Sequence, residues 1–297
     1  MKELIGTGVA LVTPFTTEGH VDVDGLTRIV GYCIDGGIDY LVVLGTTGES
    51  ATLTKKEKQL VADTVVAANN GRLPLVLGVG GNNTAAVVEE LRELDLTNFD
   101  VVLSVSPYYN KPTQEGIYQH FKVIAAASPL PIIVYNVPSR TGSNMAPQTT
   151  VRLANDCPKI IAIKEASGDM EQVRHILRQR PNGFMVISGD DATALETTLA
   201  GGSGVISVLG QGLPAEFSAM IRLGLNGEAA EARALHHTLH SGMELIFQEG
   251  NPAGIKAIFE ILNLATAKVR LPLMEASTRL KGELLRFVEQ KLKHTVS

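Results

Sequence analysis

The chain contains no tryptophan, and aromatic residues make up only 5% of its 297 residues. A hydrophobic fraction of 44% is nevertheless ordinary for a globular protein, so the predicted core is aliphatic. No run of 18 apolar residues occurs, and no segment is therefore predicted to cross a membrane. An excess of positive charge is also missing. The net charge of −5 argues against a nucleic-acid partner, which would favour a basic surface.

Cysteine is scarce as well, with Cys33 and Cys157 far apart in the sequence. Two isolated cysteines do not form a disulfide framework, and they suit a reducing compartment as small core residues. The amino-terminal residues lack the apolar segment of a signal peptide. We therefore expect a cytoplasmic protein.

Short β-branched runs alternate with helical patterns along most of the chain. Predicted helices include residues 55–69, 84–94 and 116–127. Alternation of this kind indicates right-handed βαβ units and a parallel sheet. The predicted strands span residues 8–12, 40–44, 74–79, 101–105, 132–135, 160–164, 185–188 and 204–208.

Eight such strands within about 225 residues match the size of a (β/α)8 TIM barrel. The alternative is a doubly wound open sheet, but the glycine-rich turn of that fold is missing after the first strand. Strand patterns stop near residue 226, and residues 228–246, 252–262 and 275–292 are predicted helices. We expect a barrel domain over 1–225 and a helical appendage over 226–297.

Lys164 ends the apolar strand pattern at 160–164 and is the main catalytic candidate. A buried lysine has a lowered pKa, because desolvation disfavours the charged form. A neutral amine is a nucleophile for carbonyl carbon, the chemistry of Schiff-base enzymes. The alternative is a lysine whose amine reaches solvent past the strand end.

Other strand ends carry polar groups that belong on the same face of a barrel. Thr46 and Thr47 follow the second strand in a glycine-flanked loop, where hydroxyls and backbone N–H groups could bind a carboxylate or phosphate. The structural alternative is a tight turn that ends in a helix N-cap. Tyr135 and Tyr109 lie at the ends of later strands. They are candidates for proton transfer, and the alternative is that they are amphipathic rings at the solvent-exposed edge of the barrel. Arg140 is either a carboxylate clamp or a surface ion-pair residue.

Two further motifs have weaker functional interpretations. Asp190 and Asp191 follow the seventh strand, and they could either cap a helix or act as a functional pair. His236 and His240 have the one-turn spacing that metal ligands use, but no adjacent glutamate or third ligand accompanies them. We predict no metal site there.

The strand-end motifs together resemble the pyruvate-dependent class I aldolase family that includes dihydrodipicolinate synthases and N-acetylneuraminate lyases. The likeness runs from residue 6 to about residue 285 and rests on GTTGE at 45–49, YNVP at 135–138 and IKEASG at 163–168. Thr46-Thr47, the segment SPYYNKP at 106–112 and Arg140 favour the synthase branch over the lyases of sialic acid.

This resemblance implies a mechanism and a set of roles. Lys164 forms an imine with pyruvate, whose enamine adds to L-aspartate 4-semialdehyde without a metal or organic cofactor. Tyr135 relays protons, and Thr46 links it to Tyr109, which enters the site of a neighbouring subunit in a homotetramer. The remaining substrate-binding residues are Thr47 for the pyruvate carboxylate, Arg140 for the semialdehyde carboxylate, and Gly189 and Ile206 around Lys164.

Two other functions stay open at this point. One is a sister lyase that cleaves a 2-keto-3-deoxy sugar acid or N-acetylneuraminate through the same imine. The other is a barrel that binds a keto acid without turnover, which the full set of candidate residues argues against.

The resemblance also bears on feedback inhibition by L-lysine at a dimer interface. Ser50, Ala51, Asn82 and Tyr108 match the inhibited members. Lys55 and Lys58 stand where inhibited members have histidines, and Ala86 stands where they have a glutamate. We expect weak inhibition or none, unless Glu89 or Glu90 supplies the missing carboxylate.

Overall fold

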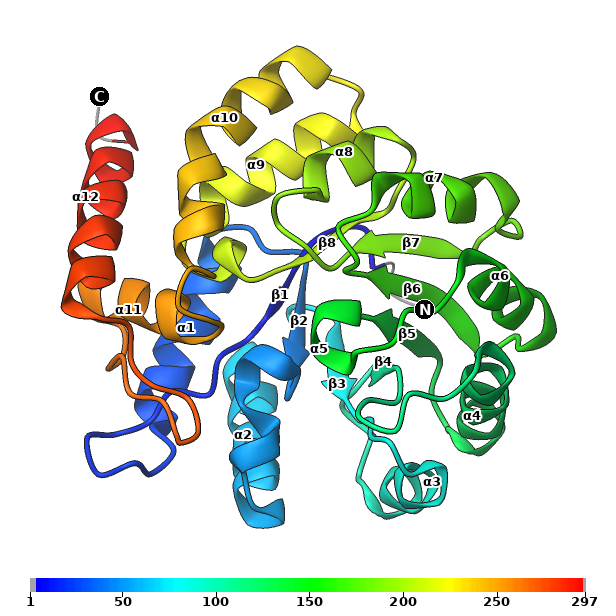
Figure 1. Ribbon diagram of the computed structural model, residues 1–297. Helices are drawn as coiled ribbons and strands as arrows, with labels where there is room; N and C mark the ends of the chain where they lie inside the picture. The colour runs from blue at the N-terminus through cyan, green and yellow to red at the C-terminus, as the bar shows by residue number, and fades with distance from the viewer. Residues whose placement is uncertain (1–3, 296–297) are drawn as a thin grey trace.

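The computed structural model describes residues 4–295, and its centre is a closed barrel of eight parallel strands in sequence order (Figure 1). The predicted (β/α)8 fold is confirmed, and each strand lies within two residues of its predicted bounds. The strands are β1 (Gly6–Ala10), β2 (Tyr40–Val43), β3 (Leu75–Gly78), β4 (Val101–Val105), β5 (Ile132–Asn136), β6 (Ile160–Glu165), β7 (Met185–Ser188) and β8 (Gly204–Ser207).

The first strand starts and ends earlier than the predicted 8–12. Its pairing with β8 begins at Gly6 opposite Gly204, and the backbone N–H of Val12 donates to the side chain of Gln211 at 3.0 Å. Gly204 has φ +118°, and a Cβ there would lie 1.9 Å from the carbonyl oxygen of Gly6. A glycine is therefore required where the barrel closes.

Helices surround the barrel on its outside (Figure 1). Helix α2 has the predicted bounds, because Thr54 and Glu57 form a reciprocal capping box at its start. The helices that follow the strands are α1 (Val23–Asp35), α2 (Lys55–Asn69), α3 (Thr84–Glu93), α4 (Gln114–Ala127), α5 (Pro138–Thr141), α6 (Pro147–Asp156), α7 (Met170–Gln179), α8 (Ala194–Leu199) and α9 (Pro214–Leu225).

Alternation along the strands separates two apolar clusters. One cluster fills the barrel and includes Tyr40, Val42, Ile133, Ala162 and Ile206. The other fills the layer between strands and helices. Since residues two apart share a face, Lys164 lies on the inner face with Ala162 and is carried into the barrel.

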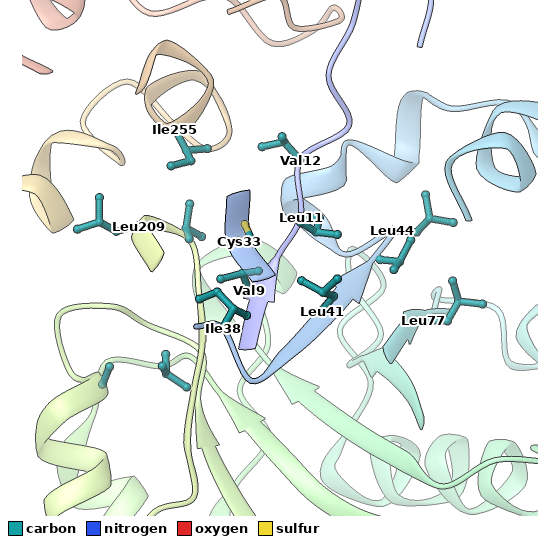
Figure 2. Packing of buried hydrophobic residues seen from close by; sticks show 14 of the residues in the cluster. Val9, Leu11, Val12, Cys33, Ile38, Leu41, Leu44, Leu77, Leu209 and Ile255 are labelled. Atoms are coloured by element: carbon teal, nitrogen blue, oxygen red, sulfur yellow. The ribbon is translucent and has the colours of Figure 1, made fainter. Parts of the chain in front are cut away.

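Three further helices follow: α10 (Ala229–Leu245), α11 (Ala253–Ile261) and α12 (Thr278–Thr295). Figure 2 shows Ile255 of α11 among the buried side chains around β1. The last helix begins at Thr278, so the predicted start at 275 is wrong. The Ser277 backbone N–H and hydroxyl bind Glu249, and its Oγ accepts from the N–H of Leu280, which places a cap at 277. The division at residue 225 stays a prediction.

Candidate active site

Lys164 is the centre of the site, and only 5% of it is exposed. The alternative in which its amine reaches solvent is therefore wrong. Burial lowers the pKa of Lys164 to about 7; the carboxylate of Asp191 opposes this shift and the charge of Arg140 adds to it. About half of the molecules then hold a neutral amine at pH 7.

Tyr135 is the immediate neighbour of Lys164, because β5 and β6 pair these two residues in register. The Lys164 Nζ lies 4.4 Å from the centroid of the Tyr135 ring. Burial raises the pKa of Tyr135, while the charge of Arg140 and a hydrogen bond with the Thr46 side chain partly oppose the rise. The phenol therefore keeps its proton at neutral pH and has the Thr46 side chain as a hydrogen-bond partner.

The loop after β2 folds into two short 3-10 helices, Thr46–Gly48 and Ser50–Thr52. Thr47 is buried, and its Oγ1 accepts a hydrogen bond of 3.0 Å from Nδ2 of Asn251. The hydroxyl of Thr13 donates to the carbonyl of Gly48 at 2.7 Å and holds the loop against β1. Thr46 is exposed and faces the cavity.

An open cavity of about 480 Å³ lies over these residues. Thr46, Tyr135 and Arg140 line it, as does Tyr108. Lys164 is not among the lining residues and lies behind them, with its amine against the ring of Tyr135, which does line the cavity. The structure thus brings Lys164, Tyr135, Thr46 and Arg140 together.

Of the two residues expected around Lys164, Gly189 lies next to it. A Cβ at Gly189 would come within 2.9 Å of Cε of Lys164 and 2.7 Å of Cβ of Ala166. Glycine is therefore needed for the lysine stem to pass. Ile206 is buried in the barrel cluster that contains Tyr135.

Tyr109 stands apart from the other candidates. Its side chain is 88% exposed, and its backbone has a positive φ of 73°. Tyr108 is partly covered, and its carbonyl accepts from Nδ2 of Asn82 at 3.1 Å. Within one chain, Tyr109 does not pack into the site.

Asp190 and Asp191 have different environments, which the sequence did not separate. Asp190 accepts from the backbone N–H and the hydroxyl of Thr193 in the turn before α8, whose N-cap residue is Thr193 itself. Asp191 is 1% exposed and accepts from the N–H groups of Val208 and Leu209. Burial raises the pKa of Asp191 to about 6, so at pH 7 it is mostly an anion near Lys164. The signal for it was a pair of acids in the loop that follows a buried strand.

Glu165 is a second buried acid that the sequence reasoning left without a role. Adjacent residues of a strand point to opposite faces, so Glu165 lies outside the barrel. Its carboxylate accepts from the side-chain amides of Asn136 and Gln172 and from the N–H of Ser167. These bonds fix the end of β6 and so the position of Lys164.

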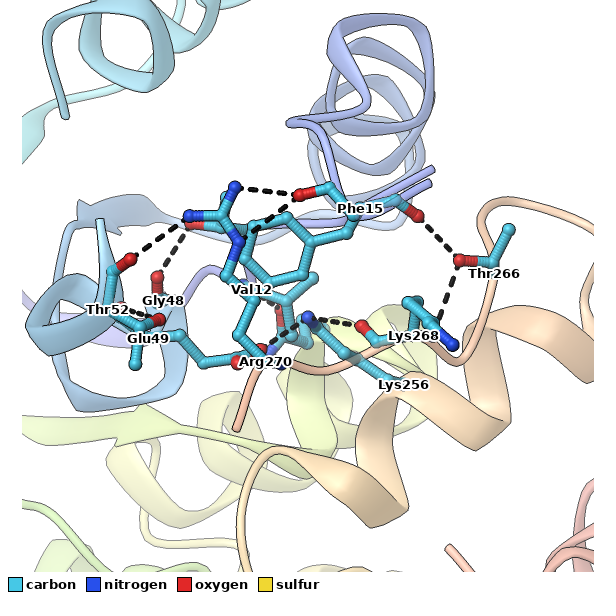
Figure 3. A network of polar contacts seen from close by, with 12 residues as sticks. Val12, Phe15, Gly48, Glu49, Thr52, Lys256, Thr266, Lys268 and Arg270 are labelled. Atoms are coloured by element: carbon cyan, nitrogen blue, oxygen red, sulfur yellow. Dashed lines mark hydrogen bonds and ion pairs between the residues drawn. The ribbon is translucent and has the colours of Figure 1, made fainter. Parts of the chain in front are cut away.

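A second buried lysine, Lys256 of α11, lies near the same loop in a polar network (Figure 3). Its Nζ forms an ion pair with Glu49 and donates to the carbonyl of Lys268 at 2.8 Å. The other Glu49 oxygen accepts from the backbone N–H of Arg270 at 2.9 Å. Lys256 and Arg270 also contact the ring of Phe15. The network ties the carboxyl-terminal region to the loop after β2.

The histidine pair does not form a metal site. His236 Nε2 contacts the carbonyl of Ala192, and His240 pairs with Glu244. Among the described residues, no cluster of three or more histidine, cysteine or acidic side chains is arranged to hold a metal ion. The described helices also include none with the length and hydropathy of a membrane span.

Comparison with known proteins adds independent evidence. The model of the dihydrodipicolinate synthetase family matches residues 3–291. The 4-hydroxy-tetrahydrodipicolinate synthase of Flavobacterium psychrophilum is 59% identical over 290 residues, covering 98% of this chain and 99% of that protein. Among solved structures, a dihydrodipicolinate synthase from Thermotoga maritima has a TM-score of 0.94 at 36% identity, covering 96% of this chain and 98% of that one. A monomeric dihydrodipicolinate synthase variant has a TM-score of 0.93 at 37% identity, covering 96% of each chain.

Proposed function

The chain belongs to the dihydrodipicolinate synthetase family, and on that premise we propose that it is a lyase that condenses pyruvate with L-aspartate 4-semialdehyde. This is the reaction of a 4-hydroxy-tetrahydrodipicolinate synthase, the first committed step of the diaminopimelate route to L-lysine. The observation that carries the proposal is the buried amine of Lys164, with a pKa of about 7, beside the phenol of Tyr135.

The neutral Lys164 amine adds to the ketone carbon of pyruvate, and loss of water gives a protonated imine. That imine accepts electrons, so the pyruvate methyl group passes a proton to Tyr135, which has just given its own to the leaving oxygen, and the imine becomes an enamine. The enamine carbon then attacks the aldehyde carbon of L-aspartate 4-semialdehyde. The amino group of that substrate displaces the Lys164 nitrogen as the ring closes. The imine supplies the electron sink, so the proposal requires no metal or organic cofactor.

The surrounding residues suit this sequence of steps. Tyr135 keeps its proton at neutral pH and lies beside Lys164, which supports a role in delivering that proton to the oxygen that leaves as water. Thr47 and nearby backbone N–H groups would bind the pyruvate carboxylate, while Gly189 and Ile206 shape the space around Lys164. Arg140 lines the cavity, which supports a role in binding the carboxylate of the second substrate.

We also propose a cytoplasmic homotetramer built from two dimers. The adjacent Tyr108 and Tyr109 rings, 41% and 88% exposed, support a neighbouring subunit there, because aromatic side chains are enriched at protein–protein interfaces. In the dimer, Tyr109 would join Thr46 of the other subunit and extend its link to Tyr135. Light scattering combined with activity checks this: a fully active monomer would rule out a shared site.

The decisive test is an assay of pyruvate with L-aspartate 4-semialdehyde against cleavage of 2-keto-3-deoxy sugar acids and N-acetylneuraminate. The proposal expects turnover with the semialdehyde and little with the sugar acids. Borohydride trapping with pyruvate runs beside it. If pyruvate is trapped but the protein cleaves sugar acids faster than it uses the semialdehyde, the protein is a sister lyase. If pyruvate is not trapped and no substrate is turned over, the barrel only binds a keto acid.

A further inference from the structure

Asn251 joins the carboxyl-terminal helices to the loop after β2. It lies just before α11, lines the cavity, and is only 7% exposed. Its Nδ2 donates to Oγ1 of Thr47, a residue 204 positions away in the sequence. A side chain outside the barrel strands thus contacts the threonine proposed to bind the pyruvate carboxylate.

This contact decides which way the Thr47 hydroxyl can donate. A hydroxyl has one proton and two lone pairs, and a carboxylate can only accept hydrogen bonds. Because the Asn251 amide occupies a lone pair of Thr47 Oγ1, the hydroxyl proton remains for a different acceptor. Turning the amide around would place its oxygen on Thr47 and draw that proton away from the substrate.

We propose that Asn251 is a positioning residue that holds the Thr47 hydroxyl as a hydrogen-bond donor toward the substrate carboxylate. This inference rests on the function proposed above. We expect Asn251 to affect how tightly pyruvate binds and not the reaction of its ketone with Lys164.

Two further observations fit this role. Lys256 follows Asn251 by five residues and pairs with Glu49, which follows Thr47 by two, so the helix and the loop are joined at two neighbouring points. The Asn251 Oδ1 is buried and makes no hydrogen bond among the described residues. Thr47 is therefore the contact that orients the amide.

The test is a double-mutant cycle read by borohydride trapping with pyruvate alone. Asn251→Leu should raise the half-saturating pyruvate concentration about fivefold, the effect of one neutral hydrogen bond. The carboxylate of Asn251→Asp can only accept from Thr47, and it adds a negative charge near the substrate carboxylate. This variant should therefore raise the half-saturating pyruvate concentration about thirtyfold or more. In a Thr47→Val background, the effect of Asn251→Leu should shrink to less than about twofold, because the two residues act as one unit. Asn155→Asp, an exposed change on α6, is the matched control and should leave trapping unchanged.

Equal effects of Asn251→Leu in both backgrounds would overturn the inference, as would an unchanged pyruvate requirement in the single variant. If circular dichroism shows that Asn251→Leu does not fold, the near-isosteric Asn251→Asp carries the same cycle. Failure of the wild-type protein to trap pyruvate would refute the proposed function itself, an outcome distinct from loss of the coupling.

Discussion

Lys164 and Lys256 are two nearly fully buried lysines with opposite uses. Lys256 touches the carboxylate of Glu49 and the carbonyl of Lys268, and its pKa, lowered by burial, is about 8. Lys164 faces the ring of Tyr135, has Asp191 nearby, and has a pKa of about 7. At pH 7 Lys256 is therefore mostly an ammonium, whereas about half of Lys164 is a free amine.

The difference shows that burial alone does not make a lysine reactive. Direct contact with a carboxylate keeps Lys256 charged, and a charge that is paired in this way holds the loop to α11. Without such a contact, burial shifts Lys164 toward the neutral form that attacks carbonyl carbon. The environment of each amine, and not its depth, separates the ion-paired Lys256 from Lys164, the lysine that we propose as the nucleophile.

The largest effect should come from Lys164→Ala. Removing the nucleophile should lower turnover by about a thousandfold or more, because covalent catalysis depends on this one amine. The fold should persist, since the change removes a buried amine that makes no ion pair with any residue that the structure describes. Steady-state kinetics and thermal melting check both parts. A variant that keeps more than about one per cent of the wild-type rate would contradict the imine mechanism.

Lys256→Met should have the reverse profile. Loss of the ammonium leaves Glu49 as an uncompensated buried charge, which should cost about 3–5 kcal/mol of unfolding free energy. Urea denaturation measures this change, and the folded protein should still trap pyruvate. Adding Glu49→Gln should recover much of the lost stability. Loss of trapping in a fully folded Lys256→Met protein would mean that the two lysines are not separate in function.

Arg140→Ala should separate the two substrates. Loss of the carboxylate partner should cost about 2 kcal/mol in kcat/KM for the second substrate, the low end of the range for charge pairs because Arg140 is exposed. Trapping with pyruvate alone should change little, and Arg174→Ala on the exposed face of α7 serves as the control. If trapping falls as far as turnover, Arg140 acts on the imine and not on the semialdehyde.

The smallest effect should be that of L-lysine. Ala86 supplies no carboxylate, and the cavity residues Lys58 and Glu90 lie near each other, with Nζ and Oε1 3.8 Å apart. We therefore predict half-inhibition only above about a millimolar, a binding free energy weaker than about −4 kcal/mol. Initial rates at subsaturating pyruvate test this. Stronger inhibition would mean that Glu90 leaves Lys58 to bind the inhibitor.

Local patterns explain why the sequence predicted the barrel and much of the site. β-branched runs set the strands, the Thr54 capping box set the start of α2, and the position of Lys164 at a strand end marked the lysine that we propose as the nucleophile. Long-range contacts could not be predicted in this way. Asn251 meets Thr47 across 204 residues and Lys256 meets Glu49 across 207, so only the folded chain shows either pair.

The central claim is that Lys164, and not Lys256, is the free amine at neutral pH. Borohydride quenches at increasing times after mixing with pyruvate, followed by peptide mapping, give the site and the rate of imine formation at each pH. Because attack needs the neutral amine, the rate should rise about tenfold per pH unit below pH 7 and level off above it. The adduct should map to Lys164. An adduct on Lys256, or a rate still rising steeply beyond pH 9 as for an ordinary lysine, would contradict the account.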